Sequence, residues 1–371
     1  MKKWSIVILG LLLTWALVEH MIPSSDTPIL SIRESIHEHH DAGQVEQRDL
    51  SRDSKVDKSR TTLQSLVQPT EILNASPYQV EAYEVFSPLT KKVLRKARYE
   101  RCKRRLKQKP FTFLQLTYRS NGLKINAFMG LPEGFSPQKR YPVILFHLGG
   151  RLGLSRFHAC TALLVSRLFI EHGYVVVVPQ YRGVAGSEGT EEFGGAEVTD
   201  TVILTQILKQ VKFIDSKNLF LSGGSRGGMM VYLALKQGAK VNAAFTYAAP
   251  VNLYRTIKDF AWFEPVVLTK LVPGFSKQRD SEIQKRSALF WPHLLHTELL
   301  ILHGKKDKRV PHLPVELFCQ KLRSIGRKCQ LSLYPSGTHF NIYKQSRREV
   351  LTWLRQRYKS GTLEAVAPKG L

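Results

Sequence analysis

The most reactive arrangement in the chain is a serine inside a glycine-rich segment, Gly223-Gly224-Ser225-Arg226-Gly227-Gly228. The segment directly follows an apolar run at 218–222 and opens a second one at 228–235. A G-x-S-x-G pattern between a buried strand and a helix is typical of a sharp turn that lifts the hydroxyl above a sheet edge. The pattern predicts Ser225 as a nucleophile. A purely structural turn and a phosphate loop are the alternatives, but the G-x-G-x-x-G of a dinucleotide loop is absent.

A serine hydroxyl needs a neighbouring base before it attacks effectively. Asp307 follows the apolar run at 298–303, and His339 follows the last such run, at 329–335. The chain order Ser, acid, His, with each residue after a strand, places the three at one edge of a parallel sheet. We therefore expect His339 to be the general base and Asp307 to fix its tautomer. Taken alone, Asp307 could instead pair with the basic residues that flank it.

An oxyanion formed by attack of Ser225 would need two hydrogen-bond donors. The first expected donor is the backbone N–H of Arg226, immediately after the nucleophile. The second is expected from the loop at 147–151, with the backbone of Leu148 as the candidate, because its glycines allow close approach. The Arg226 side chain either faces an acidic substrate or pairs with a nearby acid.

Regular apolar, β-branched runs alternate with amphipathic helical stretches along the chain. The first two runs follow each other around Ser120-Asn121-Gly122, a hairpin signal. The remaining runs alternate with helices, which indicates parallel strands with helices on both faces. The sequence predicts an α/β protein with an eight-stranded, mostly parallel sheet, the α/β-hydrolase layout. The predicted strands are 111–118, 124–131, 143–147, 174–179, 218–222, 241–247, 298–303 and 329–334.

At this point the chain resembles the catalytic domain of the prolyl oligopeptidase family, over about 111–358. The segments that carry the resemblance are YPVILFHLGG, VVPQYRGVAGSEG, GGSRGG, RSALFWPHLLHTELLILHGKKDKRVP and LYPSGTHF. The resemblance implies an α/β-hydrolase fold, a Ser225–Asp307–His339 triad, and a segment 180–183 packed beside the active site. The chain departs from the family in carrying Arg226 after the nucleophile and in lacking the β-propeller of larger members.

The residues before the predicted catalytic domain (111–360) divide into three segments. Lys2 and Lys3 precede an apolar run at 4–18, so residues 1–22 are expected to be a signal peptide or membrane anchor. Residues 23–68 are polar and are interpreted as a tether, in which the histidines at 37, 39 and 40 are expected to be solvated. Residues 69–110 are expected to form a basic, helical bracing segment. This organisation predicts an extracytoplasmic protein, membrane-anchored or secreted, in the periplasm or outside the cell.

The formal net charge is +25, and the basic residues concentrate in the run Lys91–Lys109. This run indicates either a solvated helix or attraction to an anionic surface. No nucleic-acid-binding motif accompanies it, so a specific nucleic-acid partner is not expected. The four cysteines lack metal-site spacing, and Cys319 and Cys329 are close enough in the predicted fold for a disulfide. Four unpaired thiols are the alternative.

Together these features predict a serine hydrolase that cleaves peptide or ester bonds through an acyl-Ser225 intermediate, without a metal or cofactor. The expected partners are a small peptide or ester substrate, and a membrane through the N-terminal segment. The segment 250–296 is expected to cap the site and to supply aromatic side chains. The alternative is a non-catalytic, membrane-tethered protein of the same fold that binds a polyanion through Lys91–Lys109.

Overall fold

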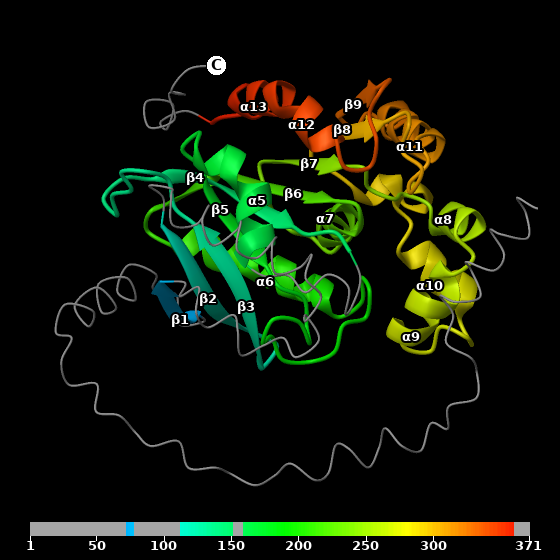
Figure 1. Ribbon diagram of the computed structural model, residues 1–371, viewed down its shortest axis with the longest axis horizontal. Helices are drawn as coiled ribbons and strands as arrows, with labels where there is room; N and C mark the ends of the chain where they lie inside the picture. The colour runs from blue at the N-terminus through cyan, green and yellow to red at the C-terminus, as the bar shows by residue number, and fades with distance from the viewer. Residues whose placement is uncertain (1–71, 78–111, 151–158, 360–371) are drawn as a thin grey trace, which may run out of the picture. The chain divides into compact units, whose positions relative to one another are not determined.

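A computed structural model describes residues 72–77, 112–150 and 159–359 (Figure 1). The N-terminal anchor and the tether expected at 1–68, the basic run Lys91–Lys109, Cys102 and the side chain of Cys160 lie outside the described residues. Within the described ranges no helix is long and apolar enough to cross a membrane.

A single mixed sheet of nine strands forms the centre of the described part. The strands lie in the order β1-β2-β3-β5-β4-β6-β7-β8-β9. Pairing is antiparallel from β1 to β5 and parallel from β5 to β9. The strands are β1 (Ile72–Pro77), β2 (Phe113–Ser120), β3 (Leu123–Gly130), β4 (Tyr141–His147), β5 (Val175–Pro179), β6 (Ile214–Gly224), β7 (Ala243–Tyr247), β8 (Leu299–Gly304) and β9 (Cys329–Tyr334).

The eight predicted strands are all present, and the prediction of a mostly parallel α/β sheet is confirmed. The strand count was wrong by one, because β1 adds a ninth strand at the antiparallel edge. This strand lies in the segment 69–110, for which helices were expected; its six residues are extended and pair with β2. The local sequence of β1 gives no clear strand signal, because Asn74, Ser76 and Pro77 have low strand propensity. The segment is a strand because it pairs with β2.

Adjacent residues of β7 identify the helices on each face, because successive side chains of a strand point to opposite faces. The ring of Phe245 lies 5.6 Å from Phe169 and 6.3 Å from Trp353. Thr246 is hydrogen-bonded to Tyr232 at 2.8 Å on the other face. The first face is covered by α5 (Ala159–Ile170) and α13 (Arg347–Arg355), and the second by α6 (Glu197–Gln210), α7 (Arg226–Lys236) and α11 (Leu313–Ser324).

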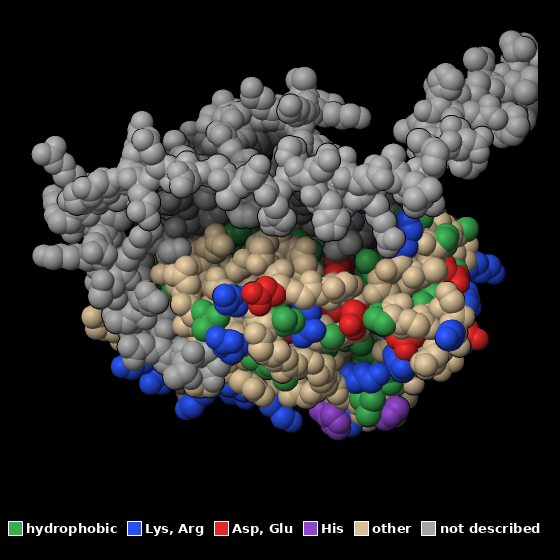
Figure 2. Space-filling model, turned by 90° about the horizontal axis from the view of Figure 1, so that it is seen from below, with side chains coloured by type: hydrophobic (Ala, Val, Ile, Leu, Met, Phe, Trp, Pro, Cys, Tyr) green, Lys and Arg blue, Asp and Glu red, His purple; other side chains and the backbone are tan. Residues whose placement is uncertain are grey.

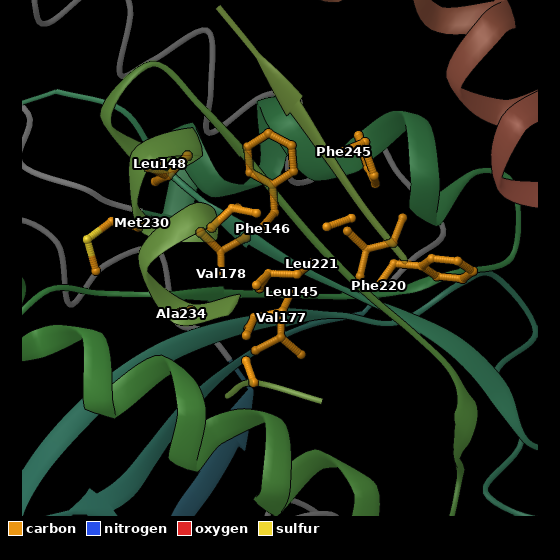
Figure 3. Packing of buried hydrophobic residues seen from close by; sticks show 14 of the residues in the cluster. Leu145, Phe146, Leu148, Val177, Val178, Phe220, Leu221, Met230, Ala234 and Phe245 are labelled. Carbon is orange, nitrogen blue, oxygen red and sulfur yellow. The ribbon is translucent and has the colours of Figure 1, made fainter. Parts of the chain in front are cut away.

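Burial on both faces explains why the central strands are continuously apolar. Every residue of β4, β5, β7 and β8 is buried. Figure 3 shows side chains of β4, β5 and β6 packed together, with Met230 and Ala234 contributed by α7. This core fixes the carboxyl ends of the parallel strands, where the candidate site lies.

The segment 250–296 forms short helices that group together beside the sheet (Figure 1). Its aromatic side chains divide between interior and surface: Phe275 and Trp291 are buried, whereas Trp262 is 49% exposed. Its elements are α8 (Leu253–Asp259), the π-helix η2 (Glu264–Leu268), α9 (Thr269–Leu271), α10 (Arg279–Lys285), and the 3₁₀ turns η3 (Ala288–Phe290) and η4 (Pro292–Leu294). A short helix, α12 (Ile342–Gln345), precedes α13.

Charges of both signs are interspersed over the face of the domain seen in Figure 2, and its apolar side chains form small separate patches. That face therefore shows no continuous cationic surface.

Of the two alternatives for Cys319 and Cys329, the structure shows the disulfide, which links α11 to β9. The two cysteines are ten positions apart, so the bridge closes a short loop. Replacing both cysteines by alanine is expected to lower the free energy of unfolding by about 3 kcal/mol, because the unfolded chain gains loop entropy. Urea unfolding of the oxidised protein and the double variant measures this difference. Equal unfolding midpoints and slopes would contradict the prediction.

Candidate active site

Ser225 occupies the turn between β6 and α7 with a backbone conformation that few non-glycine residues adopt. Its φ is 53° and its ψ is −126°. Such a conformation costs about 1–3 kcal/mol and persists only where the surrounding structure enforces it. Here the Ser225 N–H donates to the carbonyl of Tyr247 at 2.8 Å, and the Ser225 carbonyl accepts the N–H of Gly228 at 2.9 Å. The strained turn predicted by G-x-S-x-G is therefore present.

Asp307 and His339 are brought together by the loops after β8 and β9. The distance from His339 Nδ1 to Asp307 Oδ2 is 2.8 Å. Both residues are buried, each at 8% exposure. The other oxygen of Asp307, Oδ1, accepts the backbone N–H groups of Arg309 at 2.8 Å and Val310 at 2.9 Å. Asp307 is thus held by its own loop and is not a surface ion-pair partner.

The electrostatic environment of Asp307 favours its charged form. Burial alone would raise the pKa of the Asp307 carboxyl, but the hydrogen bond and charge of His339, with the two backbone N–H groups, lower the pKa below its ordinary value. His303 lies beneath this pair: its Nε2 is 2.9 Å from the carbonyl of Val310 and 3.7 Å from Asp307 Oδ2. Burial lowers the pKa of His303, which keeps that ring neutral.

Strand register brings the three loops to one edge of the sheet. Gly224 at the end of β6 is opposite Tyr247 of β7, and Tyr247 is opposite Leu302 of β8. Gly304 at the end of β8 is opposite Tyr334 of β9. Parallel neighbours are about 4.8 Å apart, so the turn of Ser225 lies about two strand spacings from the loop of Asp307. Within the described residues, the Ser225 hydroxyl forms no hydrogen bond with His339.

The loop after β4 approaches the Ser225 turn closely, as expected for a second oxyanion donor. A Cβ on Gly149 would lie 2.7 Å from the Gly224 carbonyl oxygen and 3.0 Å from Ser225 Cβ. The preceding carbonyl, of Leu148, accepts the hydroxyl of Tyr181 at 2.9 Å. Arg226 is the first residue of α7, so its N–H has no partner within the helix. Both expected donors, Arg226 and Leu148, therefore flank Ser225, and their role remains a prediction.

Replacing Gly149 by alanine tests this close approach. The added Cβ must displace the loop or the Ser225 turn, and a displacement of this size at a reacting centre is expected to lower kcat about 10²-fold. Steady-state kinetics measures the loss, and thermal unfolding shows whether the variant is folded. A folded Gly149→Ala protein with unchanged kcat would exclude this loop from the site.

The Arg226 side chain is buried at 3% exposure and pairs with acids, which is the second of its two expected orientations. It forms ion pairs with Glu191 and with Glu197, the latter at 3.2 Å. Its guanidinium also stacks over the ring of Tyr181, 4.0 Å from the centroid. Tyr181 belongs to the segment 180–183 that the family resemblance placed beside the active site. Burial raises the pKa of Glu191, an effect that the Arg226 charge opposes.

Sequence reasoning missed Tyr343 of α12. Its ring stacks on Tyr247 with 4.5 Å between centroids, and a Cβ on Gly224 would overlap its hydroxyl. Tyr343 thus fills the space between the Ser225 turn and the segment that carries His339. The only sequence signal is its position four residues after His339, which does not distinguish it from a surface tyrosine.

His147, at the end of β4, is buried at 1% exposure, and neither ring nitrogen has a hydrogen-bond partner within the described residues. Burial, assisted by the charge of Arg226, lowers the pKa of His147 to about 3. Between that value and the ordinary His pKa near 6.5, the unfolded chain binds a proton that the folded protein does not. His147 therefore destabilises the folded protein as pH falls through this window and contributes no pH dependence above it.

The expected slope from His147 is about 1.4 kcal/mol of unfolding free energy per pH unit within that window. His147→Leu should flatten the dependence measured by urea unfolding between pH 4 and 7. His303 keeps its own contribution in both proteins because its pKa is also lowered. Parallel curves for the wild type and His147→Leu would contradict the assignment.

The chain is similar in sequence to known peptidases. The chain is 24% identical over 246 residues to the uncharacterized peptidase YtmA of Bacillus subtilis, covering 65% of this chain and 93% of that protein. It is 26% identical over 253 residues to dipeptidyl-peptidase 5 of Porphyromonas endodontalis, covering 63% of this chain but only 36% of that protein. The matched region is thus about a third of the longer peptidase.

Solved structures share the fold at low sequence identity. The acylaminoacyl peptidase of Pyrococcus horikoshii matches 71% of this chain and 45% of its own, with a TM-score of 0.58 and 18% identity. An esterase of Thermogutta terrifontis, Est2, matches 69% of this chain and 96% of its own, with a TM-score of 0.50 and 19% identity. The model of the prolyl oligopeptidase family matches residues 162–359, which is more than half of the chain. The resemblance read from the sequence is confirmed, and the chain belongs to the prolyl oligopeptidase family.

Proposed function

We propose that this protein is a serine hydrolase in which Ser225 attacks a peptide or ester carbonyl and is acylated. The observation that carries the proposal is the buried hydrogen bond between His339 and Asp307, formed at the same sheet edge as the strained Ser225 turn. A protein that only binds a ligand has no need for these three residues at three separate strand ends. Family membership supports the same conclusion.

The geometry suggests a role for each group. Asp307 engages His339 Nδ1, which leaves Nε2 to take the Ser225 proton as the Oγ–acyl bond forms. The backbone N–H of Arg226 and the loop at Leu148 receive the developing oxyanion. His339 then protonates the leaving group, the bond to that group breaks, and a water activated by the same imidazole releases the acid product.

We propose peptides as the first substrate class, with esters second. The sequence relative named as a dipeptidyl-peptidase supports peptides, while the likenesses to the acylaminoacyl peptidase and esterase structures concern the fold alone. Matched p-nitrophenyl esters and p-nitroanilides that share one acyl group provide the test. An anilide turned over at a kcat within about tenfold of its ester indicates a peptidase, because an amine leaving group demands protonation by His339. Turnover of the ester alone would restrict the proposal to esterase activity.

Labelling with a fluorophosphonate tests the broader proposal. The wild-type protein is expected to label, since the probe requires only an activated serine and an oxyanion site. Failure to label, under conditions in which a known serine hydrolase does, would overturn the proposal. The binding-only alternative rests on Lys91–Lys109, outside the described residues, and neither of the two peptidase relatives described above favours it.

We further propose that the protein works outside the cytoplasm. The Cys319–Cys329 disulfide supports this location because disulfides persist in oxidising compartments. The two lysines before the apolar run at 4–18 support it as well. Intact cells are labelled with a membrane-impermeant, amine-reactive ester and then fractionated, and the extent of labelling measures how accessible this protein is from outside the cytoplasm. Protection equal to that of a cytoplasmic marker would contradict this location.

A further inference from the structure

Beyond the triad, an exposed aromatic side chain and a cation lie directly against the general base. Phe340 follows His339, and the two rings pack edge to face with 5.2 Å between centroids. The guanidinium of Arg309 stacks over the ring of Phe340, 4.7 Å from its centroid. Phe340 is 66% exposed, an unusual state for a phenylalanine beside a buried imidazole.

Arg309 is held in this place by the catalytic loop itself. Its backbone N–H donates to Asp307 Oδ1 at 2.8 Å, so the carboxylate that orients His339 also fixes the start of the Arg309 side chain. Phe340 fixes the other end. The Arg309 side chain is thus held at its backbone and at its guanidinium, so it loses little conformational freedom on binding a ligand. The planar fork of N–H donors on a guanidinium suits a carboxylate.

The charge of Arg309 is uncompensated in the described part of the chain. No ion pair joins it to a carboxylate there, whereas Arg182, Arg226 and Arg286 each pair with at least one. The same loop exposes Lys305, Lys306 and Lys308, and these also lack ion pairs among the described residues. Its acid, Asp307, is buried and engaged by His339. The loop that carries the partner of His339 therefore holds several exposed cations without ion pairs among the described residues, and Arg309 is the one that packs on Phe340.

The direction of the chemistry says which half of a substrate meets this rim. His339 passes its proton to the departing atom, so the leaving group lies on the imidazole side of the scissile bond. Phe340 packs against this imidazole, and Arg309 packs on Phe340. Arg309 takes no part in bond making or breaking; it would bind a group that the departing half carries.

We propose that the Arg309–Phe340 pair is a leaving-group subsite that selects substrates whose departing half bears a carboxylate. The inference rests on the proposed hydrolase function. The expected substrates are peptides that place a carboxylate just after the scissile bond. This carboxylate is either the free carboxyl terminus of a short peptide or the side chain of an Asp or Glu. The two sources share one chemistry, a carboxylate within reach of the guanidinium, and the substrates below separate them.

The first test compares acetyl esters of 4-hydroxybenzoate and 4-hydroxybenzamide, which transfer the same acyl group and differ in the leaving-group charge. The wild-type ratio of kcat/KM should favour the carboxylate about ten- to hundredfold, as for a hydrogen-bonded charge pair. Arg309→Met, which retains the backbone N–H to Asp307, should reduce that ratio about tenfold or more. A wild-type ratio near one, or an unchanged ratio in Arg309→Met, would overturn the subsite.

Lys305→Met is the matched control, because it removes one exposed cation of the same loop that does not stack on Phe340. It should retain the wild-type ratio within about twofold; an equal loss in both variants would mean a diffuse field and not a subsite. Should Arg309→Met fail to fold, Arg309→Lys carries the test. Its ratio should fall severalfold because a point charge lacks the planar fork, and a wild-type ratio would contradict the proposal.

Peptides distinguish the two carboxylate sources. Alanyl-alanyl-glycine against its amide tests the carboxyl terminus, and alanyl-alanyl-glutamyl amide against the glutaminyl amide tests the side chain. A preference for the charged member of either peptide pair that is lost in Arg309→Met supports the subsite. The absence of a preference in the esters and in each of the two peptide pairs opposes it. Fluorophosphonate labelling keeps the two hypotheses apart: a wild type that labels yet ignores leaving-group charge refutes only the subsite.

Discussion

Ser225→Ala is expected to abolish fluorophosphonate labelling and to lower kcat by about 10⁴- to 10⁶-fold while the fold remains intact. The serine hydroxyl is the only part of the residue that the reaction requires. Its backbone bonds to Tyr247 and Gly228 do not involve the side chain, and alanine accommodates the same turn about as well. Labelling and steady-state kinetics with the preferred p-nitrophenyl substrate measure the two effects.

Ser222 provides the matched control for this experiment. It lies three residues earlier on β6, is fully buried, and its hydroxyl has no hydrogen-bond partner within the described residues. Ser222→Ala should therefore label like the wild type. Labelling that persists in Ser225→Ala would show that another residue is the nucleophile and would remove the basis of the proposed mechanism.

The elements that position the site could be predicted because each has a strong local signal. The strands before Ser225 and Asp307, β6 and β8, are apolar runs that are largely or wholly buried, and the turn at Ser225 is packed so tightly that its glycines have no room for a side chain. The strand before His339, β9, lies at the sheet edge and is mostly half-buried, but its apolar run still marks it as a strand. The chain order of the three residues then selected them as the candidate triad without any knowledge of distances. The same layout brought Cys319 and Cys329 close enough for a disulfide but left unpaired thiols as the alternative, and the structure contains the bridge.

The features that escaped prediction depend on contacts between segments far apart in sequence. The acids that pair with Arg226 lie about 30 residues upstream, in a segment with neither helical nor strand periodicity at Glu191. β1 forms only through its pairing with β2, across 35 intervening residues. Tyr343 reaches the Ser225 turn through the packing of α12. Local composition carries no information on such contacts, so a single sequence leaves them open.

Asp307→Asn is expected to lower kcat by about 10⁴-fold with little change in stability. The reason is the fixed orientation of this side chain. Two backbone N–H groups, from Arg309 and Val310, point at Oδ1, so the carbonyl oxygen of an asparagine would occupy that position. The amide N–H₂ would then face His339 Nδ1 and force it to act as the acceptor. The proton moves to Nε2, and the imidazole can no longer take the proton of Ser225.

Two measurements separate this tautomer effect from a general loss of structure or charge. Asp259→Asn removes an equal charge from a surface pair with Arg255 and should leave kcat unchanged. Thermal unfolding of Asp307→Asn should stay near that of the wild type above the ordinary Asp pKa, because asparagine keeps both backbone bonds. Because the pKa of Asp307 is lowered in the folded protein, any stability that its charge gives the wild type is lost as pH falls from the ordinary Asp pKa through this lowered value. Below the lowered pKa the carboxyl is protonated in both the folded and the unfolded protein. An Asp307→Asn protein with wild-type kcat would mean that His339 acts without Asp307, and the assignment of the acid would have to be abandoned.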